Sequence, residues 1–175
     1  MKITRNAAIQ MFRTLGTMAL GHIEVATLDE TMDNYNAFRK VAEDFDKLRE
    51  ELSKRLYHGI DEKRKDDFFA IVEKYEREND ADKKAEYISI METYTEIYPI
   101  YEKHLIVLAS LADKEVEVEI NKVDKDKFVR GILKGNSGNN AFMIEYAFGF
   151  MFKDAEKKED DFSELDELLK QILTL

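Results

Sequence analysis

Hydrophobic residues recur along most of the chain at intervals of three or four, the spacing that places them on one side of an α-helix. The longest series consists of Leu28, Met32, Tyr35, Phe38, Val41, Phe45, Leu48, Leu52 and Leu56. Shorter series predict helices over residues 8–19, 68–75, 85–98 and 105–111. Such stripes pack against one another in helical hairpins and coiled coils. We therefore predict a mainly α protein built as an antiparallel helical hairpin or bundle.

Short polar residues and glycines mark the expected ends of these helices. A short polar side chain can accept a hydrogen bond from the free N–H groups of the first turn. The expected caps are Thr4 or Asn6 for the first helix, Thr27 with Glu30 as a capping box for the long helix, and Asp61 for the third. Glycine favours helix ends, so Gly21 and Gly59 are expected to follow the first and second helices.

Pro99 lies inside the helical pattern that runs from Ala85 to Leu111. Proline has no backbone N–H, and its ring clashes with the preceding turn of a helix. We therefore expect a kink or a break at this position.

One segment has the pattern of a β-strand. Residues 115–120 read Glu-Val-Glu-Val-Glu-Ile, so that the apolar side chains alternate onto one face. A strand needs a partner for its backbone groups. Residues 2–4 are the expected partner, and we predict one short strand pair between residues 2–4 and residues 115–120.

The C-terminal third of the chain consists of small segments of contrasting composition. A short helix is expected from Asp124 to Leu133, followed by a loop over residues 135–140. The pattern predicts a helical domain over residues 1–152, a charged linker over residues 153–161 and an amphipathic helix over residues 162–175.

The apolar stretch from Ala141 to Phe152 allows two interpretations. It is apolar on nearly all sides, which is typical of a fully buried helix. It is also rich in methionine and phenylalanine, which suit an adaptable contact surface. On the second interpretation the partner-binding residues would be Phe142, Met143, Tyr146, Phe150 and Met151.

The expected C-terminal helix also has an apolar face, which includes Phe162, Leu165 and Leu169. A face of this kind favours association when it is left bare in water. It is therefore expected either to cover the helical domain of its own chain or to bind a second chain, and both alternatives stay open.

The chain is acidic, with a formal net charge of −10 from 37 Asp and Glu against 27 Lys and Arg. Such a charge disfavours direct binding to nucleic acid phosphates and to anionic membranes. It suits a basic protein partner. One acidic face of the long helix is expected from Glu43, Asp44, Asp46, Glu50 and Glu51.

We find no pattern that predicts catalysis, a metal site or a cofactor. The chain has no cysteine, and His22, His58 and His104 have none of the spacings with which metal ligands converge on one helix. The pairs of aspartates lack the glycine and the further oxygen ligands of a calcium loop. No apolar run is long enough to span a bilayer and no signal-peptide core is present, so we expect a cytoplasmic protein.

Three segments in this order resemble an uncharacterised family of small phage and prophage proteins. They are the opening residues 2–9, the charged helix around residues 45–52, and residues 111–120 leading to Asp126 and Phe128. The resemblance covers residues 1 to about 152. It implies a phage or prophage origin and a role in virion assembly or in contact with host machinery, and no site residues.

These observations lead to three functional hypotheses. The first is a non-enzymatic protein–protein interaction protein of phage or prophage type, for which a homo-oligomer is also open. The second is an acidic inhibitor that blocks the nucleic-acid-binding surface of a host protein by imitating phosphates. The third is an enzyme with a carboxylate site on the inner face of the helical bundle.

Overall fold

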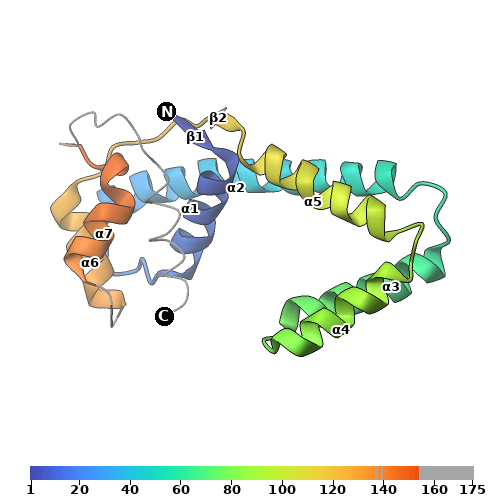
Figure 1. The fold of residues 1–175 in the computed structure, drawn as a ribbon. Helices are drawn as coiled ribbons and strands as arrows, with labels where there is room; N and C mark the ends of the chain where they lie inside the picture. Colours follow the sequence, from blue (N-terminus) through green and yellow to red (C-terminus); the bar gives the residue numbers. More distant parts are fainter. Residues whose placement is uncertain (137, 139, 154–175) are drawn as a thin grey trace. The chain divides into compact units, whose positions relative to one another are not determined.

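The computed structural model describes residues 1–136, 138 and 140–153 (Figure 1). The chain forms two compact units: unit 1 consists of Met1–Phe45 and the chain from Ala112 onward, and unit 2 of Asp46–Leu111. The elements are, in order, β1 (Lys2–Thr4), α1 (Arg5–Thr17), α2 (Val25–Leu56), α3 (Glu62–Arg77), α4 (Ala81–Glu92), α5 (Tyr98–Ala112), β2 (Glu115–Glu117), α6 (Lys125–Gly135), α7 (Ala141–Phe148) and the 3₁₀ helix η1 (Gly149–Met151). The predicted fold class, mainly α with one strand pair and small C-terminal helices, is confirmed.

Side-chain caps begin most of these helices. In each case an oxygen of the cap accepts a hydrogen bond from a backbone N–H of the first turn, which would otherwise have no partner. The capping residues are Thr4, Asp61, Asp80, Asp124 and Asn140. The predicted caps Thr4 and Asp61 are confirmed, and Gly59 follows α2 with φ 84°, a conformation that suits glycine.

The strand pair joins the beginnings of the two chain segments that make up unit 1. β1 and β2 are antiparallel, and Ile3 lies opposite Val116. The flanking bonds Arg5 N–H to Lys114 O (2.9 Å) and Val118 N–H to Met1 O (2.8 Å) extend the pairing at both ends. The predicted pairing is confirmed, although β2 ends at Glu117.

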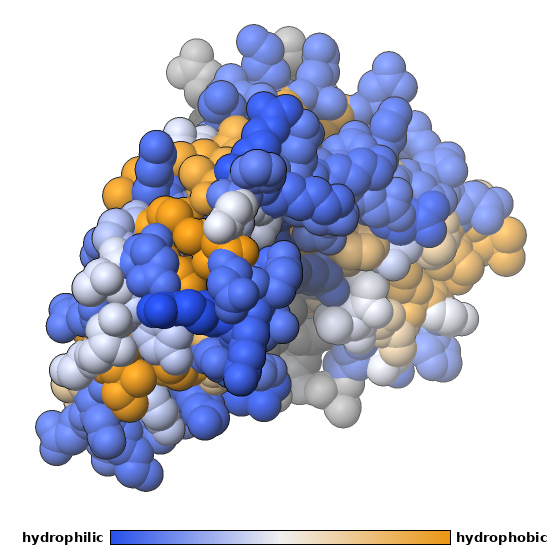
Figure 2. All heavy atoms as spheres, turned by 90° about the vertical axis from the view of Figure 1, so that its right-hand side faces the viewer, coloured by the Kyte–Doolittle hydropathy of each residue, from blue (hydrophilic) through white to orange (hydrophobic). Residues whose placement is uncertain are grey.

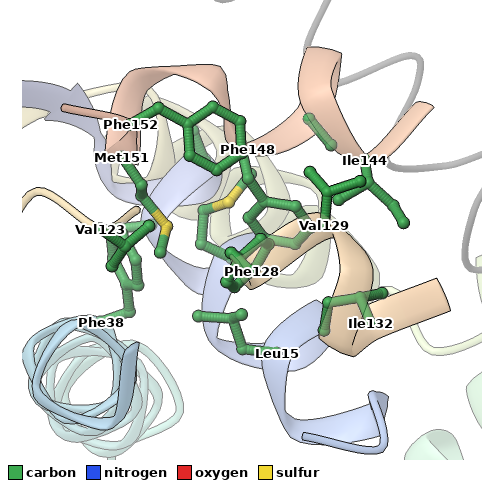
Figure 3. Close-up of a cluster of buried hydrophobic side chains, with 14 of the residues drawn as sticks. Leu15, Phe38, Val123, Phe128, Val129, Ile132, Ile144, Phe148, Met151 and Phe152 are labelled. Carbon is green, nitrogen blue, oxygen red and sulfur yellow. The ribbon is translucent and has the colours of Figure 1, made fainter. Parts of the chain in front are cut away.

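The core of unit 1 lies where α1, α2, α6 and α7 meet (Figure 3). Phe128 of α6 is at its centre, with the rings of Phe148 and Phe152 at centroid distances of 5.3 and 5.8 Å. Leu15 of α1 and Phe38 of α2 are also completely or almost completely buried. This core fastens residues 123–152 to the N-terminal 45 residues.

Two asparagine side chains hold irregular segments of unit 1 in place. Asn34 on α2 donates to Asn121 O (2.9 Å) and accepts from Asn121 N–H (2.7 Å). Asn136 makes the same paired contact with Ala19, accepting from its N–H (2.9 Å) and donating to its O (3.3 Å). A carboxamide carries one acceptor and two donors, so it can pair with a peptide group as a neighbouring strand would.

The buried face of α2 in unit 1 differs from the predicted stripe. Thr27, Thr31 and Asn34 are buried, whereas Met32 is 38% exposed. Thr31 is tolerated inside the fold because its hydroxyl donates a hydrogen bond to Thr27 O (2.7 Å). The predicted stripe is therefore wrong at Met32, whereas Leu28 and Tyr35 are half-buried against the core of unit 1. Polar side chains that find partners inside the fold share the buried face with them.

The capping box predicted at the start of α2 is also wrong. The helix begins at Val25, so Thr27 lies within its first turn. Glu30 instead forms an ion pair with Lys153 (3.3 Å). The pair joins α2 to the end of the described chain.

Unit 2 is held together by aromatic residues. α3 and α4 run side by side (Figure 1), and Phe68 of α3 is completely buried. Its ring contacts those of Phe69, Tyr94 and Tyr101 edge to face, at centroid distances of 5.4 to 5.6 Å. This geometry brings the positive edge of one ring to the negative face of another.

The break expected near Pro99 is confirmed. α4 ends at Glu92 and α5 begins at Tyr98, so that Pro99 lies in the first turn of α5. A proline is tolerated there because the N–H it lacks would have no partner within the helix. Ile97, which is completely buried, fixes the connection to the core of unit 2.

The first testable prediction concerns Gly131, where α6 touches the loop between α1 and α2. A Cβ atom at this position would lie 2.6 Å from Ile23 Cγ1 and 2.7 Å from Ile23 Cα. Because a main-chain atom cannot turn away as a side chain does, Gly131→Ala should lower the free energy of unfolding by about 1–3 kcal/mol. Gly16→Ala is the matched control, since its Cβ would meet only ordinary contacts, 3.5 Å from Tyr35. Urea unfolding measures both, and equal stability of the two variants would contradict the close approach.

The second prediction concerns Asn34. Asn34→Ala leaves the N–H and C=O of Asn121 without their partner, and should lower the free energy of unfolding by about 1–3 kcal/mol. Asn36→Ala, an exposed asparagine on the same helix, should change it by less than about 0.5 kcal/mol. If the two substitutions have the same effect in chemical unfolding, the Asn34 contact contributes nothing beyond helix propensity.

Candidate partner-binding surfaces

The structure separates the five residues of α7 and η1 that the sequence marks as partner-binding. Phe142 is on the surface, 73% exposed, in the first turn of α7. Met143 and Tyr146 are half-buried beside it, and the rings of Phe142 and Tyr146 lie 6.4 Å apart. The first turns of α7 thus present an aromatic surface.

The other two residues of the set belong to the core. Met151 is completely buried, and Phe150 packs edge to face on Phe38 at 6.3 Å. The main chain here is also bound, since Val123 N–H donates to Met151 O (2.7 Å). Residues at the beginning of the segment from Ala141 to Phe152 therefore offer a surface for contact, whereas residues at its end are part of the core. The remaining predicted residues, Phe162, Leu165 and Leu169, lie outside the described residues, as does the expected linker beyond Lys153.

A second apolar surface, on α5, was not identified from the sequence as a site. The segment from Ile100 to Leu111 is largely apolar, yet α5 has no buried residue. Leu105 and Ile106 are 47% and 71% exposed, and Ala109 is exposed one turn beyond Leu105. In the view of Figure 2, which faces the right-hand side of Figure 1, hydrophobic surface is visible between hydrophilic residues.

A signal for this surface was present in the sequence. The spacing of Leu105, Leu108 and Leu111 predicts one apolar stripe on this helix, but Leu105 is exposed and the other two are only half-buried. Ile106 and Val107 lie outside that stripe. A helix with apolar residues on more than one side has more apolar surface than one packing face can cover.

The predicted acidic face of α2 is exposed, but its charges are largely paired. All five carboxylates are on the surface. Four of them form ion pairs with a cation three or four residues away on the same helix: Glu43 with Arg39, Asp46 with Arg49, Glu50 with Lys54, and Glu51 with Arg55. The hydrogen bond and the charge of Lys54 lower the pKa of Glu50. These pairs reduce the negative charge available to imitate a phosphate backbone, so nothing here favours the inhibitor hypothesis.

A tyrosine–histidine pair lies in the core of unit 2. The Tyr57 hydroxyl is 3.2 Å from His104 Nδ1, and Tyr57 is only 5% exposed. Burial raises the pKa of Tyr57 to about 12, with a smaller contribution from Tyr101. Its hydroxyl therefore stays protonated and can donate to Nδ1 of a neutral imidazole. Burial lowers the pKa of His104, with a smaller contribution from the charge of Arg49. The Nε2 atom of His104 is buried and has no hydrogen-bond partner among the described residues.

The described residues show no grouping that indicates catalysis. Among them, no three His, Asp or Glu side chains are placed to hold a metal ion. The polar residues buried in the described part are Thr14, Thr27, Thr31 and Asn34, and none carries a charge. The carboxylate-site hypothesis thus has no supporting cluster there. None of the described helices is both long and apolar enough to cross a membrane.

The third prediction follows from the lowered pKa of His104. The unfolded chain binds this proton near pH 6.5, and the folded protein only at a lower pH. The contribution of His104 to stability is therefore present above about pH 6.5 and is lost as the pH falls below that value. Wild-type protein should lose more thermal stability between about pH 7.5 and 5.5 than His104→Gln, because the variant cannot take up the proton.

His22→Gln is the control for this experiment, since His22 is exposed in unit 1. It keeps the Tyr57–His104 contact and should therefore lose thermal stability over this pH range as the wild type does. An NMR titration of the His104 ring measures the shift directly. A midpoint at or above about 6.5 would contradict the burial of the neutral imidazole.

Comparisons with known proteins place this chain in no family. No protein-family model matches the chain, and neither a curated protein nor a solved structure matches it at a significant level. The surfaces are therefore interpreted by their own chemistry.

Proposed function

We propose that the protein is a non-enzymatic protein–protein interaction module that binds an apolar segment of another protein through α5. The observation that carries this proposal is an apolar helix of 15 residues, none of which is buried, with Leu105 and Ile106 on its surface. Burying apolar surface of this kind is the main driving force of protein association. Clustered exposed hydrophobic residues on a soluble domain typically mark a contact site.

The packing of unit 2 explains how α5 can remain available. Its first turns are fixed by Tyr101 and His104, which contact the aromatic residues of the core. The positions beyond them, from Leu105 onward, contribute no buried residue. The helix is therefore anchored at one end, and beyond that end Leu105 and Ile106 lie on its surface.

The chemistry of the surface limits the class of partner. Leu105, Ile106 and Ala109 offer van der Waals contact with no charged group among them, and Glu102 and Lys103 stand at the end nearer the core. This suits an amphipathic segment that lays its apolar side on α5. The net charge of −10 favours a partner that is neutral or basic overall. The resemblance to phage proteins supports a virion or host protein as that partner.

The test is affinity purification of tagged protein from cells of its natural source, followed by substitution of Ile106. Ile106→Asp should reduce recovery of the partner at least about tenfold, because a buried unpaired carboxylate opposes binding. Val25→Asp is the matched control, since Val25 in unit 1 is also 71% exposed and β-branched. It should leave recovery unchanged.

Equal recovery with both variants would show that α5 is not the binding surface. Failure to recover any partner, together with turnover of a small molecule by the purified protein, would contradict the proposed function itself and favour the enzyme hypothesis.

A further inference from the structure

The exposed face of α6 carries a cluster of positive charge around one leucine. Arg130 and Lys134 are one turn apart and exposed, and Leu133 beside them is 37% exposed. Neither cation forms an ion pair or a hydrogen bond within the described part of the chain. Asp126 at the beginning of the helix is the opposing charge on this face, and Lys127 is paired with Glu24 (2.9 Å).

The net negative charge that could balance this cluster lies mainly in the last 22 residues of the chain and not in the described part of unit 1. The described part of unit 1 carries 12 Lys and Arg and 13 Asp and Glu, so it is nearly neutral. Residues 154–175, by contrast, contain eight Asp and Glu and only three Lys. Half of the net charge of the protein is thus in its last 22 residues.

The described chain stops beside the start of α6. Lys153 N–H donates to Val123 O (3.1 Å), and Asp124 is the cap of α6. The eight residues 154–161 can span up to about 26 Å when extended. Since the 11 residues of α6 extend about 16 Å, residues from Phe162 onward can reach Leu133.

We propose that the segment 162–175 of the same chain docks on α6, with its apolar residues on Leu133 and its carboxylates on Arg130 and Lys134. Phe162, Leu165 and Leu169 recur at the spacing of one helical face, and Glu164, Asp166 and Glu167 lie between them. The pattern matches the receiving face, which is one apolar residue flanked by two cations. Tethering favours this arrangement over a second copy, because a short linker keeps the segment at a high effective concentration near its own α6.

Because the chain has no cysteine of its own, a thiol-reactive spin label attaches only at a cysteine that is introduced by substitution. A label attached at Ser163→Cys in the full-length chain, labelled with ¹⁵N, should reduce the amide signals of residues 129–135. Lys134→Glu should restore most of that intensity, and Lys40→Glu, the same charge reversal at an exposed lysine of α2, should not. Unchanged chemical shifts of Ile3 and Phe38, which are buried in the core of unit 1 on other elements, verify that the Lys134→Glu variant is folded.

Two further measurements keep the result interpretable. Because the contacts are partly electrostatic, raising the salt concentration of the wild-type sample should weaken the effect. Mixing ¹⁵N-labelled protein without a spin label and unlabelled protein with one should give no loss of signal, since docking occurs within one chain. A loss of signal that appears in the mixed sample as well assigns the segment to a second copy and overturns the proposal. Loss elsewhere in unit 1, no loss at all, or an equal response of both charge reversals also overturns it. None of these outcomes depends on the function proposed for α5.

Discussion

In unit 1, main-chain groups that lie outside helices are paired across long sequence separations, and the arrangement of the unit depends on this pairing. A buried peptide group without a partner costs about as much as a lost hydrogen bond. β1 pairs with β2, Asn34 pairs with the main chain of Asn121, and Asn136 with that of Ala19. Each contact joins the N-terminal 45 residues to a segment near or beyond residue 115. The aromatic core around Phe128 is closed by the segments that these contacts position.

Unit 2 is organised by a different interaction. Its core is a set of rings that meet edge to face around Phe68, together with the buried Tyr57. Large rings bury much apolar surface with few residues. A small unit can therefore reach stability while α5 keeps apolar residues on its outside. Because a few large rings form the core of unit 2, Ile106 is not needed in that core and can lie on the surface.

The two surfaces identified here differ in chemistry and therefore in the partner they suit. The surface of α5 is apolar around Leu105 and Ile106, which favours another protein with an apolar segment. The surface of α6 is basic around Leu133, which favours an acidic segment such as the last residues of this chain. The acidic residues of α2 are less informative, because their neighbours on the same helix already pair with most of them.

The sequence by itself determined the features that depend on near neighbours. Thr4 and Asp61 cap helices because their side chains reach N–H groups three residues away. Pro99 lies in the first turn of α5, after the break from α4, because its ring and its missing N–H are tolerated there and not inside a helix. The alternation around Val116 was also enough to identify the strand pair.

Tertiary structure decided which polar residues are buried and which apolar ones are not. Thr31 and Asn34 are buried because they bond to groups inside the fold, in the case of Asn34 to a residue 87 positions away. Phe142 and Ile106 are exposed because the neighbouring elements cover other faces of their helices. Periodicity records which residues could share a face, but burial depends on partners that are distant in the sequence, and only the folded chain brings those together.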